Sequence, residues 1–215
     1  MPTSNAPVGR GSGPLIAALT IALLAAMAFA IPESPIALPN ATVPRGYVIG
    51  HRHFSSALAE VIARQGYNLL VLDLATARLG AGALWPDQLH RVASRRYPVW
   101  GWLDPAATAT PAEQLLRSLN LAGVLVHGRN AVAQAQVLRQ VRPGLRIVPV
   151  VKWGATPPTE GEYAVAMDAP TFALHASEHA LPLLVADQLD HAAIDAALAR
   201  VEGGCFVSRV ALLDR

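Results

Sequence analysis

Two histidines flank an arginine where the apolar stretch 47–50 ends: His51, Arg52 and His53. Alternate residues of a strand face the same side, so His51 and His53 would project together. Two imidazoles in that arrangement can hold a divalent metal, which lowers the pKa of a bound water towards neutrality. If the strand ends at His51, Arg52 is available to neutralise a phosphate or a carboxylate. The triplet therefore predicts hydrolytic chemistry, and its structural alternative is a polar strand end.

Ionisable side chains recur where later apolar stretches end. Asp73 interrupts one such stretch, and Asp104, His127, Lys152, Asp168 and Asp187 follow others. A single carboxylate at such a place more often caps the next helix than performs chemistry. As a set, however, these residues predict one site, in which the catalytic residues are His51, Arg52, His127 and Lys152. The predicted ligands of a divalent metal, whose identity stays open, are His53, Asp73 and Asp104.

The elements that must position these residues are short apolar strands separated by helical segments. Helix signals include the capping box that starts at Thr110, with Pro111 at the first helical position, and Asn130 as a second cap. Residues 154–162 are rich in Gly, Pro and Thr and predict a loop. The predicted strands are 47–51, 69–74, 99–103, 123–126, 147–151, 163–167, 181–186 and 205–212.

Strand–helix alternation predicts parallel strands joined by right-handed crossovers. Eight such units form a compact (β/α)8 TIM-like α/β barrel over residues 45–215, with every strand ending at the same rim. These residues number about 170, below the roughly 200–250 that are usual for this barrel. An open doubly wound parallel sheet is the alternative.

The N-terminal residues 1–31 predict a signal peptide or a signal anchor. An uncharged apolar run occupies residues 15–31, and Ala28-Phe29-Ala30 has the small-x-small pattern of a cleavage site. Residues 32–44 predict a linker. The barrel is therefore expected in the periplasm or outside the cell, or anchored to the inner membrane. Membrane contact would run through residues 15–31 alone, if they are not cleaved.

Composition limits the function classes. The formal net charge is only +2, and no Lys/Arg cluster with interleaved aromatic residues is present, so nucleic-acid binding has little support. The single Cys205 excludes an intrachain disulfide and a multi-cysteine zinc site. The expected partner is a small-molecule or envelope-derived substrate.

Val48–His53, Gly66 and Leu69–Asp73 together resemble the start of the glycerophosphodiester phosphodiesterase family. That family is a secreted or cytosolic TIM barrel, in which a His-Arg pair ends the first strand and a Glu-x-Asp metal pair lies on the second. The resemblance implies that His51 is the catalytic imidazole, Arg52 the phosphate contact and Asp73 a metal ligand. Val71 stands where the family has its metal-binding glutamate, and His53 where it has glycine. The His-x-His pattern is also similar, over fewer residues, to the amidohydrolase barrels.

Three functions remain open from the sequence. The first is an exported metal-dependent hydrolase that resembles a phosphodiesterase. The second is a non-catalytic TIM-barrel-like binding module of the cell envelope, which Val71 and the short loops favour. The third is a glycan-acting hydrolase, which needs two carboxylates about 5–9 Å apart, with Asp73, Asp104 and Asp168 as candidates.

Overall fold

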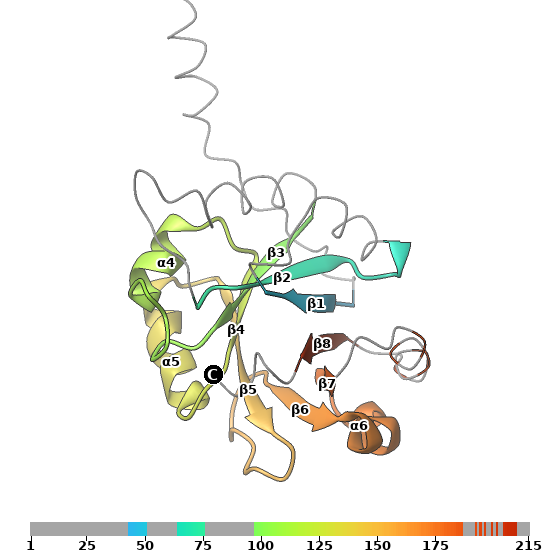
Figure 1. Cartoon of the computed structure of the whole chain (residues 1–215). Coiled ribbons are helices and arrows are strands. Elements are labelled where there is room, and N and C mark those ends of the chain that lie inside the picture. The colour runs from blue at the N-terminus through green and yellow to red at the C-terminus, as the bar shows by residue number, and fades with distance from the viewer. Residues whose placement is uncertain are drawn as a thin grey trace, which may run out of the picture. The chain divides into compact units, whose positions relative to one another are not determined.

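The computed structural model describes residues 43–50, 64–75, 97–186, 192, 194, 196, 199, 201 and 204–209 (Figure 1). All of them belong to the unit Pro35–Arg215. Its framework consists of the strands β1 (Arg45–Ile49), β2 (Leu69–Asp73), β3 (Val99–Leu103), β4 (Gly123–Val126), β5 (Arg146–Lys152), β6 (Ala164–Asp168), β7 (Pro182–Ala186) and β8 (Cys205–Arg209).

These strands form a closed barrel in which each one pairs in parallel with its sequence neighbours. Closure comes from β8, which pairs with β1 through the register Gly46↔Phe206. The predicted TIM-like α/β barrel is therefore confirmed, and the open doubly wound sheet is wrong, because an open sheet would leave β1 and β8 unpaired with each other. Strand bounds agree with the prediction within two residues where the chain is described.

The barrel interior is filled by alternate side chains of every strand, as the pleat requires. The large indole of Trp100 and the ring of Phe206 lie in this interior and are buried. Glycines on neighbouring strands make room for them: a Cβ on Gly123 would lie 2.4 Å from the Trp100 ring, and one on Gly46 would lie 2.6 Å from Phe206. Val71, at 0% exposure, belongs to the same interior cluster.

Helices cover the outside of the described barrel. They are α4 (Ala112–Ser118), α5 (Ala131–Val141) and α6 (Ala169–His175), followed by the short 3-10 helix η2 (Ala176–Glu178). The buried residues Ala131, Ala135 and Leu138 recur on one face of α5 and pack into the outer hydrophobic core. Residues 154–162 contain no helix, as predicted.

One helix start differs from the prediction. Helix α4 begins at Ala112 with Pro111 as its N-cap, one residue later than the capping box at Thr110 implies. The reason lies in the backbone of Pro111, whose ψ of 132° is extended and not helical. The predicted cap at Asn130 has the correct position, because Asn130 is the N-cap of α5.

The N-terminal end of β5 carries a charged pair. The guanidinium of Arg146 lies 5.2 Å above the Trp100 ring and donates from Nε to Glu162 at 2.7 Å.

Within the described part of the chain, no helix is long and apolar enough to cross a membrane. The predicted signal segment 1–31 lies outside the described residues.

Candidate functional site

Four of the predicted site residues continue the inward alternation of successive strands. Each of them lies two residues after a side chain of the barrel interior. The pairs are Val71 and Asp73 on β2, Trp102 and Asp104 at β3, Leu125 and His127 at β4, and Val150 and Lys152 on β5. Residues two apart on a strand face the same side, so all four are directed towards the C-terminal mouth of the barrel. His51, Arg52 and His53 lie outside the described residues.

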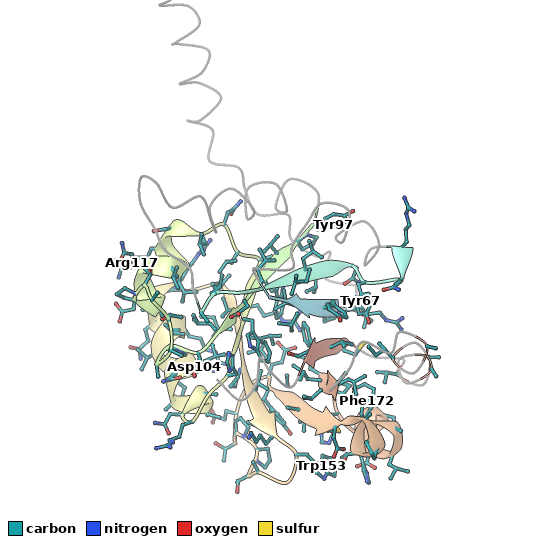
Figure 2. The ribbon with its side chains drawn as sticks, in the orientation of Figure 1. Tyr67, Tyr97, Asp104, Arg117, Trp153 and Phe172 are labelled. Carbon is teal, nitrogen blue, oxygen red and sulfur yellow. The ribbon has the colours of Figure 1, made fainter. Side chains whose placement is uncertain are left out.

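A pocket of about 1110 Å³ opens at this mouth and is lined by three of these side chains, Asp104, His127 and Lys152. They come from the ends of β3, β4 and β5, and the wall continues into Arg129, Asn130 and the first turns of α5. Figure 2 shows Asp104 on the α5 side of the barrel. The volume lies slightly above the range of about 300–1,000 Å³ that is usual for small-molecule sites.

The Asp104 carboxylate is held in place by its own loop and by the turn after β4. Asp104 is 8% exposed, and its Oδ1 accepts a hydrogen bond from the backbone N–H of Ala106 at 3.0 Å. The Cα of Gly128 faces the same carboxylate, because a Cβ there would lie 2.8 Å from Cγ of Asp104. Gly128 has a φ of +104°, which side chains rarely adopt. The turn after β4 can therefore close over Asp104 because residue 128 is glycine.

His127 is fixed by packing. Its imidazole is 3% exposed and stacks on the buried indole of Trp102, with ring centroids 4.4 Å apart and planes 21° from parallel. Its backbone N–H donates to the carbonyl of Leu103 at 2.9 Å. A buried imidazole held against a rigid ring in a pocket wall is suited to proton transfer, because its orientation is set before a substrate arrives.

Two cationic side chains also line this pocket. Arg129 and Lys152 are exposed side chains of the wall. The first turn of α5 holds no acidic residue, and Asn130 makes no side-chain cap bond to this helix. A helix N-terminus carries a partial positive charge and backbone N–H groups that suit an anion. One buried carboxylate, one buried imidazole and a cationic wall thus face a common space.

Asp73 is not part of the described wall of this pocket. It is 2% exposed, and its Oδ1 accepts from the backbone N–H of Ala75 at 3.0 Å. Within the described ranges, no three side chains of His, Cys, Asp or Glu gather in a way that could hold a metal ion. The predicted ligands Asp73 and Asp104 therefore do not complete a metal site with other described residues, and His53 lies outside them.

Asp168 has a structural role. Its carboxylate caps α6 by accepting from the backbone N–H of Thr171 at 2.9 Å. The side chain and the backbone N–H of Thr171 lower the pKa of this exposed carboxyl. This is the capping role that the sequence offered beside the functional one. Asp187 lies outside the described residues.

Several residues of the pocket are not singled out by the sequence, among them Gly128, Arg129 and Gln134. Gly128-Arg129-Asn130 joins a strand that ends in histidine to a helix, and this pattern was available as a signal for an anion-binding turn. Gln134 gives no such signal, because a glutamine near the start of a helix is ordinary.

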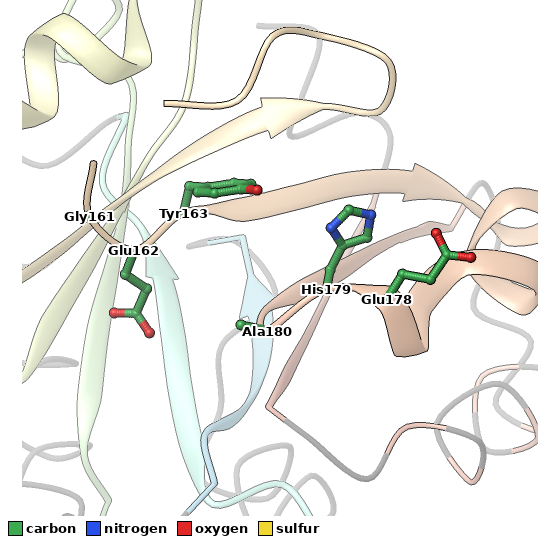
Figure 3. A pocket seen from close by; sticks show the side chains of 6 residues that line it. All are labelled: Gly161, Glu162, Tyr163, Glu178, His179 and Ala180. Atoms are coloured by element: carbon green, nitrogen blue, oxygen red, sulfur yellow. The ribbon is translucent and has the colours of Figure 1, made fainter. Parts of the chain in front are cut away.

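A second, smaller pocket of about 160 Å³ shares no described residue with the first. It is lined by Gly161, Glu162, Tyr163, Glu178, His179 and Ala180 (Figure 3). Its two carboxylates already have partners, since Glu162 binds Arg146 and Glu178 lies 3.0 Å from Nδ1 of His175.

The imidazoles of His175 and His179 both contact the indole of Trp153. The ring of His175 stacks on it at 4.7 Å, and that of His179 meets it edge-on at 5.4 Å. These contacts support a packing role for Trp153 and its neighbours.

No protein-family model and no curated protein matches the chain. The barrel and the pocket at the ends of β3, β4 and β5 are therefore the features that bear on function.

Proposed function

We propose that this protein is a hydrolase of small phosphate esters, similar in chemistry to a phosphodiesterase, with its site at the ends of β3, β4 and β5. One observation supports the proposal above the others. Asp104, His127 and Lys152 are far apart in the sequence, yet they line the same pocket. Active sites of parallel α/β barrels are built in this way, from the ends of several strands.

The two buried groups would transfer protons. A water attacks phosphorus and gives a proton to a base, the bond from phosphorus to the ester oxygen breaks, and the leaving oxygen takes a proton from an acid. In the proposal His127 and Asp104 divide these proton transfers between them, a contribution of about 10²–10⁴ in rate. Lys152, Arg129 and the N-terminus of α5 offset the negative charge that the phosphoryl oxygens carry in the transition state.

A divalent metal is a separate part of the proposal. It would require His53 to join Asp73 or Asp104, because the described residues alone do not gather three ligands. If His53 and Asp73 hold the metal, Asp104 stays available for proton transfer beside His127. If Asp104 holds it, His127 is the remaining proton-transfer group.

The second candidate function is a non-catalytic binding module of the cell envelope, where the segment 1–31 would deliver or anchor the barrel. Val71 favours it, because this fully buried side chain fills the barrel interior where the resembling family has a metal-binding glutamate. A glycan-acting hydrolase has less support, because Asp104 is the one carboxylate on the described wall of the large pocket.

Hydrolysis of bis(4-nitrophenyl) phosphate by the full-length protein tests the proposal, with and without Mn²⁺, Ca²⁺ and Zn²⁺. Asp104→Asn and His127→Asn should each lower kcat/KM about 100-fold or more. Asp168→Asn is the matched control, because this carboxylate also ends a strand but caps α6. Its kcat/KM should stay within about twofold of wild type, the range of a surface change.

Absence of turnover by the wild type under all these conditions would refute the hydrolase. Isothermal titration with phenyl phosphate then tests the binding module. The module is supported if Lys152→Gln and Arg129→Gln bind this ligand more weakly than wild type and the control Arg117→Gln binds it equally well. Arg117 is an exposed arginine of α4 and does not line the pocket.

A further inference from the structure

We infer that Trp102 is a positioning residue for proton transfer by His127. Its indole fixes the plane of the imidazole and stabilises the positive charge that His127 gains when it accepts a proton. Because Trp102 would act within the same site, the inference rests on the proposed function. Three observations support it: the register of β3 and β4, the geometry of the two rings, and the burial of both side chains.

Strands β3 and β4 bring the two rings together. Trp102 lies opposite Leu125 in the parallel register, and His127 comes two residues after Leu125, on the same side of the strand. The backbone N–H of His127 donates to the carbonyl of Leu103 at 2.9 Å, so the hydrogen bonding between the two strands continues to residue 127. His127 is therefore attached to β3 twice, through its backbone to Leu103 and through its ring to Trp102.

The two rings are stacked face to face. Their centroids are 4.4 Å apart and their planes lie 21° from parallel. The nitrogens of an imidazole and the protons on them lie in the plane of the ring, so the stack itself uses neither nitrogen. A perpendicular pair, such as His179 and Trp153 with planes 85° apart, instead directs the edge of one ring at the face of the other. The stack thus holds the plane of His127 and leaves its edge to proton transfer.

Both side chains are buried, which strengthens the effect of the indole on a charge. Trp102 is 0% exposed and His127 is 3% exposed. The face of a tryptophan ring attracts a cation within about 6 Å of its centroid, and the attraction is larger where water is excluded. When His127 accepts a proton, its charge forms within that distance of Trp102. The indole therefore stabilises the charged state through which a proton-transferring imidazole passes.

A second tryptophan on the same strand separates this role from ordinary packing. Trp100 is also buried in the barrel interior, but its ring contacts Phe206 and Arg146 and is not stacked on His127. Neither tryptophan is among the described residues that line the large pocket. Trp102 would thus affect the reaction through the imidazole on which it stacks, and Trp100 offers a matched control.

Hydrolysis of bis(4-nitrophenyl) phosphate by Trp102→Met, Trp102→Phe and Trp100→Met tests the inference. Methionine fills space without a flat ring, so Trp102→Met should lower kcat about tenfold or more and keep KM within about twofold. Trp102→Phe retains a flat ring and should keep kcat within about threefold of wild type. Trp100→Met disturbs the same interior and should keep kcat within about twofold. Equal losses of kcat in Trp102→Met and Trp100→Met would overturn the inference.

A double-mutant cycle shows whether Trp102 acts through His127. In a protein that already carries His127→Asn, Trp102→Met should cause no further loss of kcat/KM. A further tenfold loss there would mean that the indole acts elsewhere, and the inference would fail. Trp102→Leu is a second variant without a ring, for use in both measurements if Trp102→Met does not fold.

Motion of the His127 ring distinguishes the inference from the proposed function. Carbon-13 relaxation of the histidine rings measures it without turnover, and the His127 signal is identified by its loss in His127→Asn. Trp102→Met should make this ring more mobile than in wild type, whereas Trp102→Phe and Trp100→Met should not. Greater mobility in a protein that hydrolyses nothing would refute the hydrolase and retain the positioning of His127 by Trp102. Hydrolysis by the wild type with unchanged ring motion in Trp102→Met would do the reverse.

Discussion

The carboxylate of Asp104 occupies the space that a side chain on Gly128 would fill. The two residues belong to different loops, one after β3 and the other between β4 and α5, and the ideal Cβ position of Gly128 is 2.8 Å from Cγ of Asp104. Asp104 is also tied to its own loop through the N–H of Ala106. The contact therefore joins two neighbouring loops of the mouth at the acid that we assign to proton transfer.

Gly128→Ala should displace this carboxylate and lower hydrolysis about tenfold or more, because small misplacements of a reacting group are costly. The substitution also imposes a positive φ on alanine, with a cost of about 1–3 kcal/mol in stability. Gly144→Ala is the control for that cost, since Gly144 has a φ of +87° and nothing within 4 Å of its Cβ position. Equal losses of kcat/KM in the two variants would show that the contact with Asp104 has no catalytic role.

Divalent metal should stabilise the protein if His53 completes a site with Asp73 or Asp104. A ligand that binds the folded state at 100 times its Kd adds about 2.7 kcal/mol, which is visible as a rise in Tm. We expect Mn²⁺, Ca²⁺ or Zn²⁺ to raise the Tm of the wild type and to have no effect on His53→Ala. A melt that no metal shifts would remove the metal from the proposed function, and an equal shift in His53→Ala would move the site elsewhere.

Acid should weaken the start of α6 through Asp168. Thr171 lowers the pKa of this carboxyl, so the cap stabilises the folded state above the ordinary pKa of 3.8 and the contribution is lost as the pH falls below that value. Wild type should therefore be more stable than Asp168→Asn at pH 7, and the two should converge near pH 2. Urea unfolding at the two pH values measures the difference, and a gap that does not narrow at low pH would contradict the assignment.

The framework of the site was predictable because it is encoded locally. Continuous apolar stretches such as 69–72 and 123–126 stop at Asp73 and His127, and the alternation of strand side chains then fixes the direction of these residues. The closure of β8 onto β1 followed from the number of strand–helix units. For the same reason Asp104, His127 and Lys152 could be named in advance as residues of one mouth.

The details of the pocket depend on contacts between distant residues. The space beside Gly128 is defined by Asp104 on another strand, and the sequence alone shows only a glycine before a helix. Asn130 was placed correctly as an N-cap, but whether its side chain bonds to the helix depends on the loop backbone, with φ −122° and ψ 37°. The sequence patterns of Asp104 and Asp168 are alike, and their roles differ because Asp168 accepts a hydrogen bond from the backbone N–H of Thr171 at the start of α6.

Cys205 should be unreactive in the folded protein and should make stability fall at alkaline pH. The thiol is fully buried, and burial raises its pKa from 9.0 to about 11, an effect that nearby Arg45 partly opposes. Between pH 9 and 11 the thiol ionises in the unfolded chain while it stays protonated in the folded one, so stability decreases as the pH rises through this window. Two pKa units correspond to about 2.7 kcal/mol, an upper limit for the loss.

The prediction is tested by comparing the free energy of unfolding of wild type with those of Cys205→Ser and Cys205→Ala at several pH values. The stability difference between wild type and each variant should be constant from pH 6 to 8 and should shrink by pH 11, because neither variant has a thiol to titrate. Labelling with 5,5′-dithiobis(2-nitrobenzoate) at pH 8 should be slow for the native wild type and rapid in urea, since the thiolate is the reactive form. Rapid labelling of the native protein would place the thiol in contact with water and would contradict its burial in the outer hydrophobic core.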